Sequence, residues 1–142
     1  MLQRANPWQA YRKVATQTAT PGQLVLQLYD GILRFLEQAR LGFAFDDPKE
    51  FNEAINNNIQ RAHAIIRELD ASLNLEQGGE VAVTLRRLYG YFDDQLQQAN
   101  LTKTEDGITE VVRHVTGLRD AWRDMLAGHA PDTAALTAPR QA

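Results

Sequence analysis

Apolar residues recur at helical spacing through four long stretches of the chain, and strong helix-start signals precede two of them. Thr20-Pro21 is followed by Gln23, and Asp47-Pro48 by Glu50. Each group offers a capping side chain, a proline at the first helical position and a capping-box residue. Runs that alternate with the period of a half-buried strand are absent from the sequence. The pattern predicts an all-α fold with helices over residues 20–43, 47–73, 80–100 and 108–126.

The last three predicted helices each carry one apolar stripe, and polar connectors at 74–79 and 101–107 separate them. Long helices with short connectors favour an antiparallel up-down four-helix bundle. We expect an N-terminal cap or lid segment at 1–19, the bundle at 20–127 and a disordered tail at 128–142. The stripe of the third predicted helix comprises Val81, Leu85, Leu88, Phe92, Leu96 and Ala99.

The first predicted helix differs from the others because its apolar residues cover an arc of roughly 200°, about twice what one face of a bundle needs. Central packing against two or three neighbouring helices explains such an arc. The alternative is that part of the arc forms a groove for an apolar partner segment. Leu26 and Leu33 lie at the edge of the arc, so they are the members most available to a partner.

A short amphipathic segment precedes this helix, with Trp8, Tyr11 and Val14 near one face. An isolated helix of this length is unstable in water, so the segment must dock on something. Two interpretations stay open. The segment is a permanent cap on one end of the bundle, or it is a displaceable lid over a groove.

Composition argues against several classes of function. The chain has 142 residues, no cysteine and a net charge of −3, which gives no electrostatic reason to expect nucleic acid. No apolar run is long enough to cross a bilayer or resembles a signal peptide, so we expect a protein of the cytoplasm without membrane insertion. Phosphate-binding loops, nucleophile motifs and metal-ligand spacings are missing from the sequence. We therefore expect no enzyme, no cofactor and no metal site.

A few polar residues lie close to the apolar stripes. His63 lies at the edge of a stripe, and His114 projects to the polar side of the last helix, so both are expected at the surface or its boundary. Asn58 is either a boundary residue bonded to a neighbouring helix or a polar pin for a bound segment. Tyr89 and Tyr91 flank the third stripe and are either half-buried or part of a binding surface.

Seven motifs occur in a characteristic order and span residues 11–126: Tyr11, TATP at 18–21, LVLQLYDG at 24–31, GGE at 78–80, LYGYF at 88–92, LQQAN at 96–100 and LRDAW at 118–122. In this order and spacing, they resemble the flagellar secretion chaperone family, FliS. The resemblance implies a bundle in the bacterial cytosol that binds the C-terminal segment of flagellin. The family prevents premature polymerisation and keeps flagellin competent for type III export. The resemblance also implies that the N-terminal segment around Tyr11 can occupy a groove that flagellin uses.

The resemblance and the stripes together predict eight partner-binding residues in the lid and on three helices: Tyr11, Val14, Leu26, Tyr29, Leu33, Asn58, Tyr89 and Tyr91. An export-gate component or flagellar regulators are further candidate partners of the same surface. The alternative from a different class is a self-associating bundle, a structural or regulatory adaptor whose exposed stripe serves a homodimer without flagellin.

Overall fold

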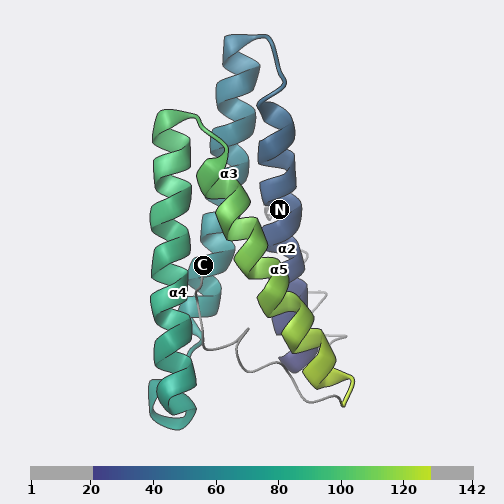
Figure 1. Cartoon of the computed structure of the whole chain (residues 1–142), viewed down its shortest axis with the longest axis vertical. Helices are drawn as coiled ribbons and strands as arrows, with labels where there is room; N and C mark the ends of the chain where they lie inside the picture. Colours follow the sequence, from purple (N-terminus) through teal and green to yellow (C-terminus); the bar gives the residue numbers. More distant parts are fainter. Residues whose placement is uncertain (1–20, 129–142) are drawn as a thin grey trace, which may run out of the picture.

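The computed structural model describes residues 21–128 of the chain. Four α-helices follow one another: α2 (Pro21–Gly42), α3 (Pro48–Ala71), α4 (Leu75–Thr102) and α5 (Asp106–Leu126) (Figure 1). Within this range there is no strand, so the predicted all-α class and the four helices are confirmed. The predicted lid segment and, apart from Gly128, the predicted tail lie outside the described residues.

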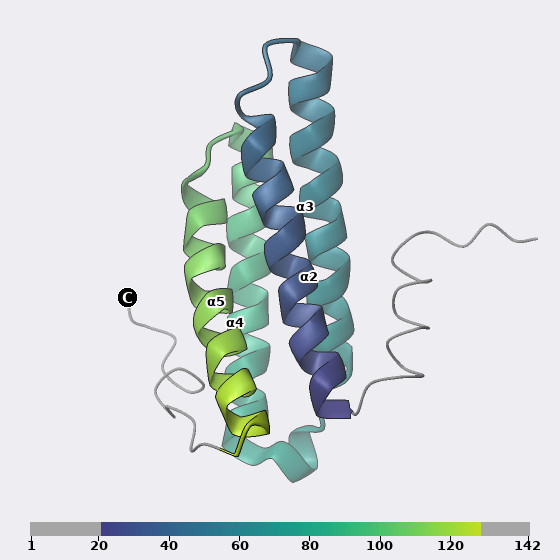
Figure 2. The ribbon, with the colours of Figure 1, turned by 90° about the vertical axis from the view of Figure 1, so that its right-hand side faces the viewer.

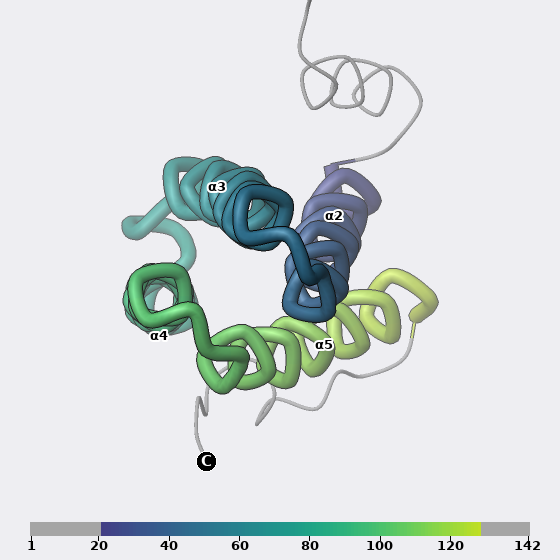
Figure 3. The backbone as a smooth tube through the Cα atoms, turned by 90° about the horizontal axis from the view of Figure 1, so that it is seen from above, coloured from purple at the N-terminus to yellow at the C-terminus, as the bar shows by residue number. Residues whose placement is uncertain are grey.

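The helices run antiparallel to their neighbours in the chain and form a closed ring (Figures 2 and 3). Each helix packs on two others, in the order α2, α3, α4, α5 and back to α2, so α2 and α4 face each other diagonally. Helix α5 crosses obliquely from the C-terminal end of α4 towards the N-terminal end of α2 (Figure 1). This crossing leaves the N-terminal part of α4 with less cover than its C-terminal part.

Local capping explains where two helices begin. The Asp47 carboxylate accepts a hydrogen bond from the Glu50 backbone N–H at 3.0 Å, as the sequence predicts. The predicted connector at 74–79 is too long, because α4 begins at Leu75. Asn74 caps α4 by accepting from the Gln77 N–H at 3.0 Å, and the helix breaks only at Gly79, where φ is 57°. Glycine adopts this angle without a steric penalty, so one helical turn precedes the break.

The predicted connector at 101–107 is also too long, because α4 continues to Thr102 and α5 begins at Asp106. Lys103 ends α4 in the left-handed region with φ of 52°, and its N–H donates to the carbonyl of Ala99. Its ammonium group donates to the Asn100 carbonyl oxygen at 2.7 Å. These bonds satisfy carbonyl groups that the helix end would otherwise leave open.

The core fills the centre of the ring with aliphatic and aromatic side chains from all four helices. In α2 the fully buried side chains include Ile32 and Leu36, whereas Leu26 and Leu33 are half-buried. Packing of α2 on both α3 and α5 accounts for most of its wide apolar arc. Among the described helices, none combines the length and apolar character required to span a membrane.

Candidate functional site

An apolar cavity of about 300 Å³ lies at the end of the bundle where α3 connects to α4. Its walls come from α2, the end of α3, the start of α4 and α5. Val25, Leu73, Leu85 and Trp122 supply much of the apolar lining. Val81, which is 43% exposed, lies at its solvent edge. A cavity of this volume accommodates a large side chain of a partner, and its mainly apolar walls suit the apolar stem of that side chain.

The path of α5 explains why the cavity forms at this end. The Trp122 indole N–H donates to the carbonyl oxygen of Gly22 at 2.9 Å, which holds the end of α5 against the start of α2. Arg119 reinforces this contact by pairing with Asp30 of α2 at 3.1 Å. Because α5 is drawn towards α2, the first turns of α4 lack a close neighbour on that side, and the cavity lies between them.

Two tyrosines contribute hydroxyl groups to the cavity wall. The hydroxyl oxygens of Tyr29 and Tyr89 lie 2.8 Å apart and share a hydrogen bond across the bundle. The side chains are 1% and 3% exposed, respectively. Burial raises the pKa of Tyr29 to about 12, and burial together with the neighbouring Tyr29 raises the pKa of Tyr89 still further. Both hydroxyls therefore stay protonated across the physiological pH range.

A second, more polar cavity of about 470 Å³ lies along the seam between α3 and α4. Its floor includes Ile59 and Leu96, and its wall includes an imidazole–carboxylate pair, His63 and Asp93, with Nδ1 and Oδ1 2.8 Å apart. Burial is the largest influence on Asp93 and raises its pKa. His63 thus lies at the helix boundary as expected, and it ties α3 to α4.

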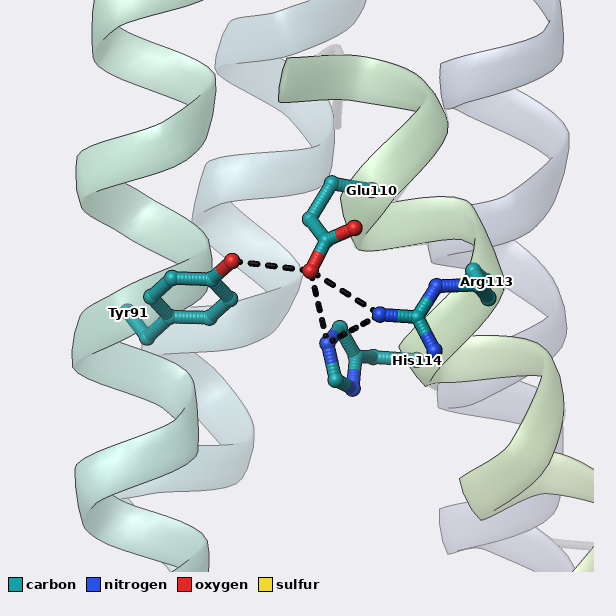
Figure 4. A network of polar contacts seen from close by, with 4 residues as sticks. All are labelled: Tyr91, Glu110, Arg113 and His114. Carbon is teal, nitrogen blue, oxygen red and sulfur yellow. Dashed lines mark hydrogen bonds and ion pairs between the residues drawn. The ribbon is translucent and has the colours of Figure 1, made fainter. Parts of the chain in front are cut away.

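Where α5 begins, four side chains join it to α4 (Figure 4). One carboxylate oxygen of Glu110 accepts from the Tyr91 hydroxyl at 2.9 Å, the His114 Nε2 at 3.0 Å and an Arg113 N–H at 3.0 Å. His114 also packs against the rings of Tyr91 and Phe92. Its side chain is only 11% exposed, so His114 lies at the boundary between core and surface, which is one of its two expected positions. An imidazole presents an apolar ring face that can pack on aromatic neighbours while its nitrogens keep polar partners.

This network makes stability depend on pH through Glu110. The hydrogen bond from Tyr91, followed by those from His114 and Arg113, lowers the pKa of Glu110 below its ordinary value of 4.5. A carboxyl group with a lowered folded-state pKa stabilises the fold above its unfolded-state pKa, and the contribution is lost as pH falls through the folded value. We expect Glu110→Gln to lower the free energy of unfolding at pH 7 by about 0.5–1 kcal/mol, as for an exposed charge pair. The difference should shrink as pH falls below 4.5 and through the lowered folded-state pKa of Glu110.

Urea unfolding of both proteins at pH 7 and pH 3.5 measures this effect. Glu53→Gln is the matched control, because it makes the same chemical change at an exposed position on α3. A difference between wild type and Glu110→Gln that is equal at both pH values would contradict the assignment.

The structure brings together some of the residues predicted to bind a partner and separates others. Tyr29 and Tyr89 line the apolar cavity, whereas Tyr91, two residues further along α4, is 38% exposed and bonds to Glu110. Leu26 and Leu33 are half-buried on α2. Asn58 donates to the carbonyl of Ala54 in its own helix at 2.8 Å, not to a neighbouring helix. Tyr11 and Val14 lie outside the described residues.

Sequence reasoning missed most of the apolar lining of the cavity. The apolar stripe predicts that Val81 is buried, yet it is exposed at the cavity edge. Its position directly after the Gly78-Gly79 pair was a usable signal, because a break there ends the regular packing of α4. Val25 and Trp122 gave no such signal, since core and cavity positions share the same helical spacing.

Comparison with known proteins identifies similar chains. A family model described as "Flagellar protein FliS" matches residues 4–129. The flagellar secretion chaperone FliS of Bacillus subtilis (strain 168) is 35% identical over 127 residues, covering 89% of this chain and 91% of that protein. FliS of Campylobacter jejuni subsp. jejuni is 35% identical over 127 residues, covering 87% and 94%. FliS of Salmonella typhimurium is 35% identical over 111 residues, covering 78% and 80%. The family match includes all four described helices and both cavities between them.

Proposed function

The chain belongs to the FliS family of flagellar proteins, and from this premise we propose that it is a cytosolic chaperone that binds the C-terminal segment of flagellin for export. In this role it prevents premature polymerisation and keeps flagellin competent for type III flagellar secretion. The observation that carries the proposal is the open apolar cavity in a bundle whose centre is otherwise filled. An apolar cavity with a solvent edge suits a side chain supplied by another protein.

The flagellin segment is disordered when free and folds into helices as it binds. Burial of its apolar faces against the bundle offsets the loss of conformational entropy. One side chain of the segment enters the cavity beside Leu85 and Trp122, and flanking turns cover the exposed edge at Val81. In this proposal, binding of the segment requires no nucleotide, cofactor or metal ion.

We assign the contacts to two groups. Tyr29 and Tyr89 act at the cavity, together with Val25, Val81 and Trp122. A longer segment then extends over neighbouring surfaces, where the remaining predicted contacts lie: Leu26, Leu33, Asn58 and Tyr91. Such an extended path follows from coupled folding, in which a disordered segment wraps a large surface.

The decisive experiment is isothermal titration of the purified chain with a peptide of the last ~50 residues of its cognate flagellin, long enough for several helical turns. We expect one-to-one binding with a large negative heat-capacity change, the mark of apolar burial. No heat and no change in apparent size would reject the proposal. An export-gate component or a flagellar regulator would then be tested in the same way.

Residues 1–19, with Tyr11 and Val14, are assigned as a lid that competes with flagellin. The described chain begins at Pro21, four residues before Val25 of the cavity wall, so the lid is attached beside the site. We expect deletion of residues 1–17 to tighten flagellin binding by about 3- to 10-fold, because the apparent affinity falls with the fraction of closed chains. Titration with the same peptide measures the change.

A matched variant replaces residues 1–17 with a glycine–serine sequence of equal length. It should bind as tightly as the deletion, since only the lid contacts are removed. Equal affinity of the full chain, the deletion and the replacement would rule out a competing lid. Weaker binding by both variants would mean that Tyr11 and Val14 contact flagellin directly.

The second candidate function is self-association through exposed apolar side chains. Leu101 is 72% exposed beside the polar cavity, which is the observation that favours it. Light scattering distinguishes the two functions, because a homodimer would form without flagellin. A dimer that dissociates when the flagellin peptide is added would mean that both functions use overlapping surfaces.

A further inference from the structure

The hydrogen bond between Tyr29 and Tyr89 leaves one hydroxyl hydrogen unused. Each hydroxyl carries one hydrogen, and a single bond between the two oxygens, 2.8 Å apart, uses only one of them. Within residues 21–128, neither hydroxyl has a second hydrogen-bond partner. The pair therefore holds one surplus donor and several acceptor lone pairs at the wall of the apolar cavity.

The other polar groups that line the cavity are already engaged. The Ser72 hydroxyl donates to the Leu69 carbonyl at 2.7 Å, and the Trp122 indole donates to the Gly22 carbonyl at 2.9 Å. The Asn74 side-chain oxygen accepts from the Gln77 N–H. The nearby Asp70 carboxylate accepts from Arg86 at 3.2 Å. Within residues 21–128, none of these groups accepts a hydrogen bond from Tyr29 or Tyr89, whose hydroxyls bond to each other.

An unpaired donor in this place has a cost that a bound partner can remove. The two side chains are almost fully buried, so bulk water does not freely solvate their hydroxyls. The raised pKa values of both tyrosines mean that the donor is not lost by ionisation at physiological pH. A ligand atom that accepts this hydrogen gains a bond that the free protein leaves unmade.

We propose that the Tyr29–Tyr89 pair selects a flagellin segment that places a side-chain amide oxygen, from asparagine or glutamine, into this cavity. The inference rests on the proposed function and specifies the chemistry of the side chain that enters. The surplus donor requires an acceptor atom. The surrounding apolar walls penalise a charged carboxylate, so a neutral oxygen is favoured. A volume of about 300 Å³ leaves room for an amide side chain and its apolar stem.

The central test uses the double variant Tyr29→Phe/Tyr89→Phe. It removes both hydroxyls, so it leaves no unpaired polar group and should keep wild-type stability in urea unfolding. Its affinity for the flagellin C-terminal peptide should fall about 5- to 10-fold, the range for one neutral hydrogen bond in a buried site. A merely structural role would change stability and leave the affinity of the folded protein unchanged.

A peptide scan identifies the acceptor. Each asparagine and glutamine of the flagellin peptide is replaced in turn by leucine, and each peptide is titrated into wild type and the double variant. One replacement should lose about 5- to 10-fold in affinity for wild type and lose nothing for the double variant. This coupling is the signature of a direct bond between that amide and the tyrosine pair.

Equal binding of the parent peptide by wild type and the double variant would overturn the inference while leaving the proposed function intact. If the double variant does not fold, the scan against wild type alone decides. Leucine replacements that all bind as tightly as the parent peptide would also overturn it. Failure of the parent peptide to bind wild type would reject the proposed function itself, which is a different result.

Discussion

Replacing Val81 with arginine should weaken flagellin binding by at least about 30-fold, the loss typical of a disrupted interface hot spot. Val81 lies at the edge of the apolar cavity, where a charged side chain would have to be buried beneath the incoming segment. Because Val81 is already 43% exposed in the free chain, stability should change by less than about 1 kcal/mol. Titration with the flagellin peptide measures the affinity, and urea unfolding measures stability.

The chain offers a closely matched control two residues away. Val83 is also a valine of α4, is 44% exposed, and does not line the cavity. Val83→Arg introduces the same charge and bulk on the same helix, so it should bind flagellin within about 2-fold of wild type, as surface changes usually do. Equal losses for the two variants would mean that net charge governs binding, and the cavity would lose its assigned role.

Truncating Phe92 to alanine should cost about 3–5 kcal/mol of unfolding free energy, the largest stability change expected for a single substitution here. Phe92 is fully buried, and its ring lies 6.2 Å from that of Tyr89 and 5.9 Å from that of His114. Removing the ring leaves a cavity between the Tyr29–Tyr89 pair and the cluster around Glu110, which both hold α4 in place. Such a loss is a large fraction of the stability of a typical domain.

Urea unfolding followed by helical circular dichroism measures this effect. Phe45→Ala is the control, because Phe45 is 45% exposed between α2 and α3 and loses the same atoms. It should cost less than about 1 kcal/mol. A cost for Phe92→Ala below about 1.5 kcal/mol would show that neighbouring side chains collapse into the space, and that this region is loosely packed.

Local signals explain what could be predicted about the fold. The Asp47 cap and the glycines after Asn74 act through bonds within a few residues, so the sequence displays them directly. The apolar stripes likewise follow from the geometry of a single helix. The predicted end of α4 is less accurate. Lys103, a residue other than glycine, adopts the left-handed conformation there and ends the helix later than expected.

The candidate site depends on contacts between distant residues, and these could not be read from spacing. Tyr29 and Tyr89 are 60 positions apart, and only the assembled ring brings their hydroxyls together. Val81 and Leu85 share one helical stripe, yet only Leu85 is buried, because α5 crosses away from the first turns of α4. The direction in which a neighbouring helix crosses is a property of the whole bundle.

The oblique course of α5 also means that a small rotation of this helix would displace its last turn by a larger distance. Its N-terminal end is fixed to α4 by the cluster around Glu110, while its other end borders the cavity. With 21 residues the helix is about 30 Å long, so a pivot of only about 5° at the fixed end displaces the last turn by about 3 Å. That displacement is close to the width of a methyl group. Because Trp122 and Arg119 bond this end of α5 to α2, such a rotation would have to break these contacts or move α2 as well, and they therefore fix the width of the cavity.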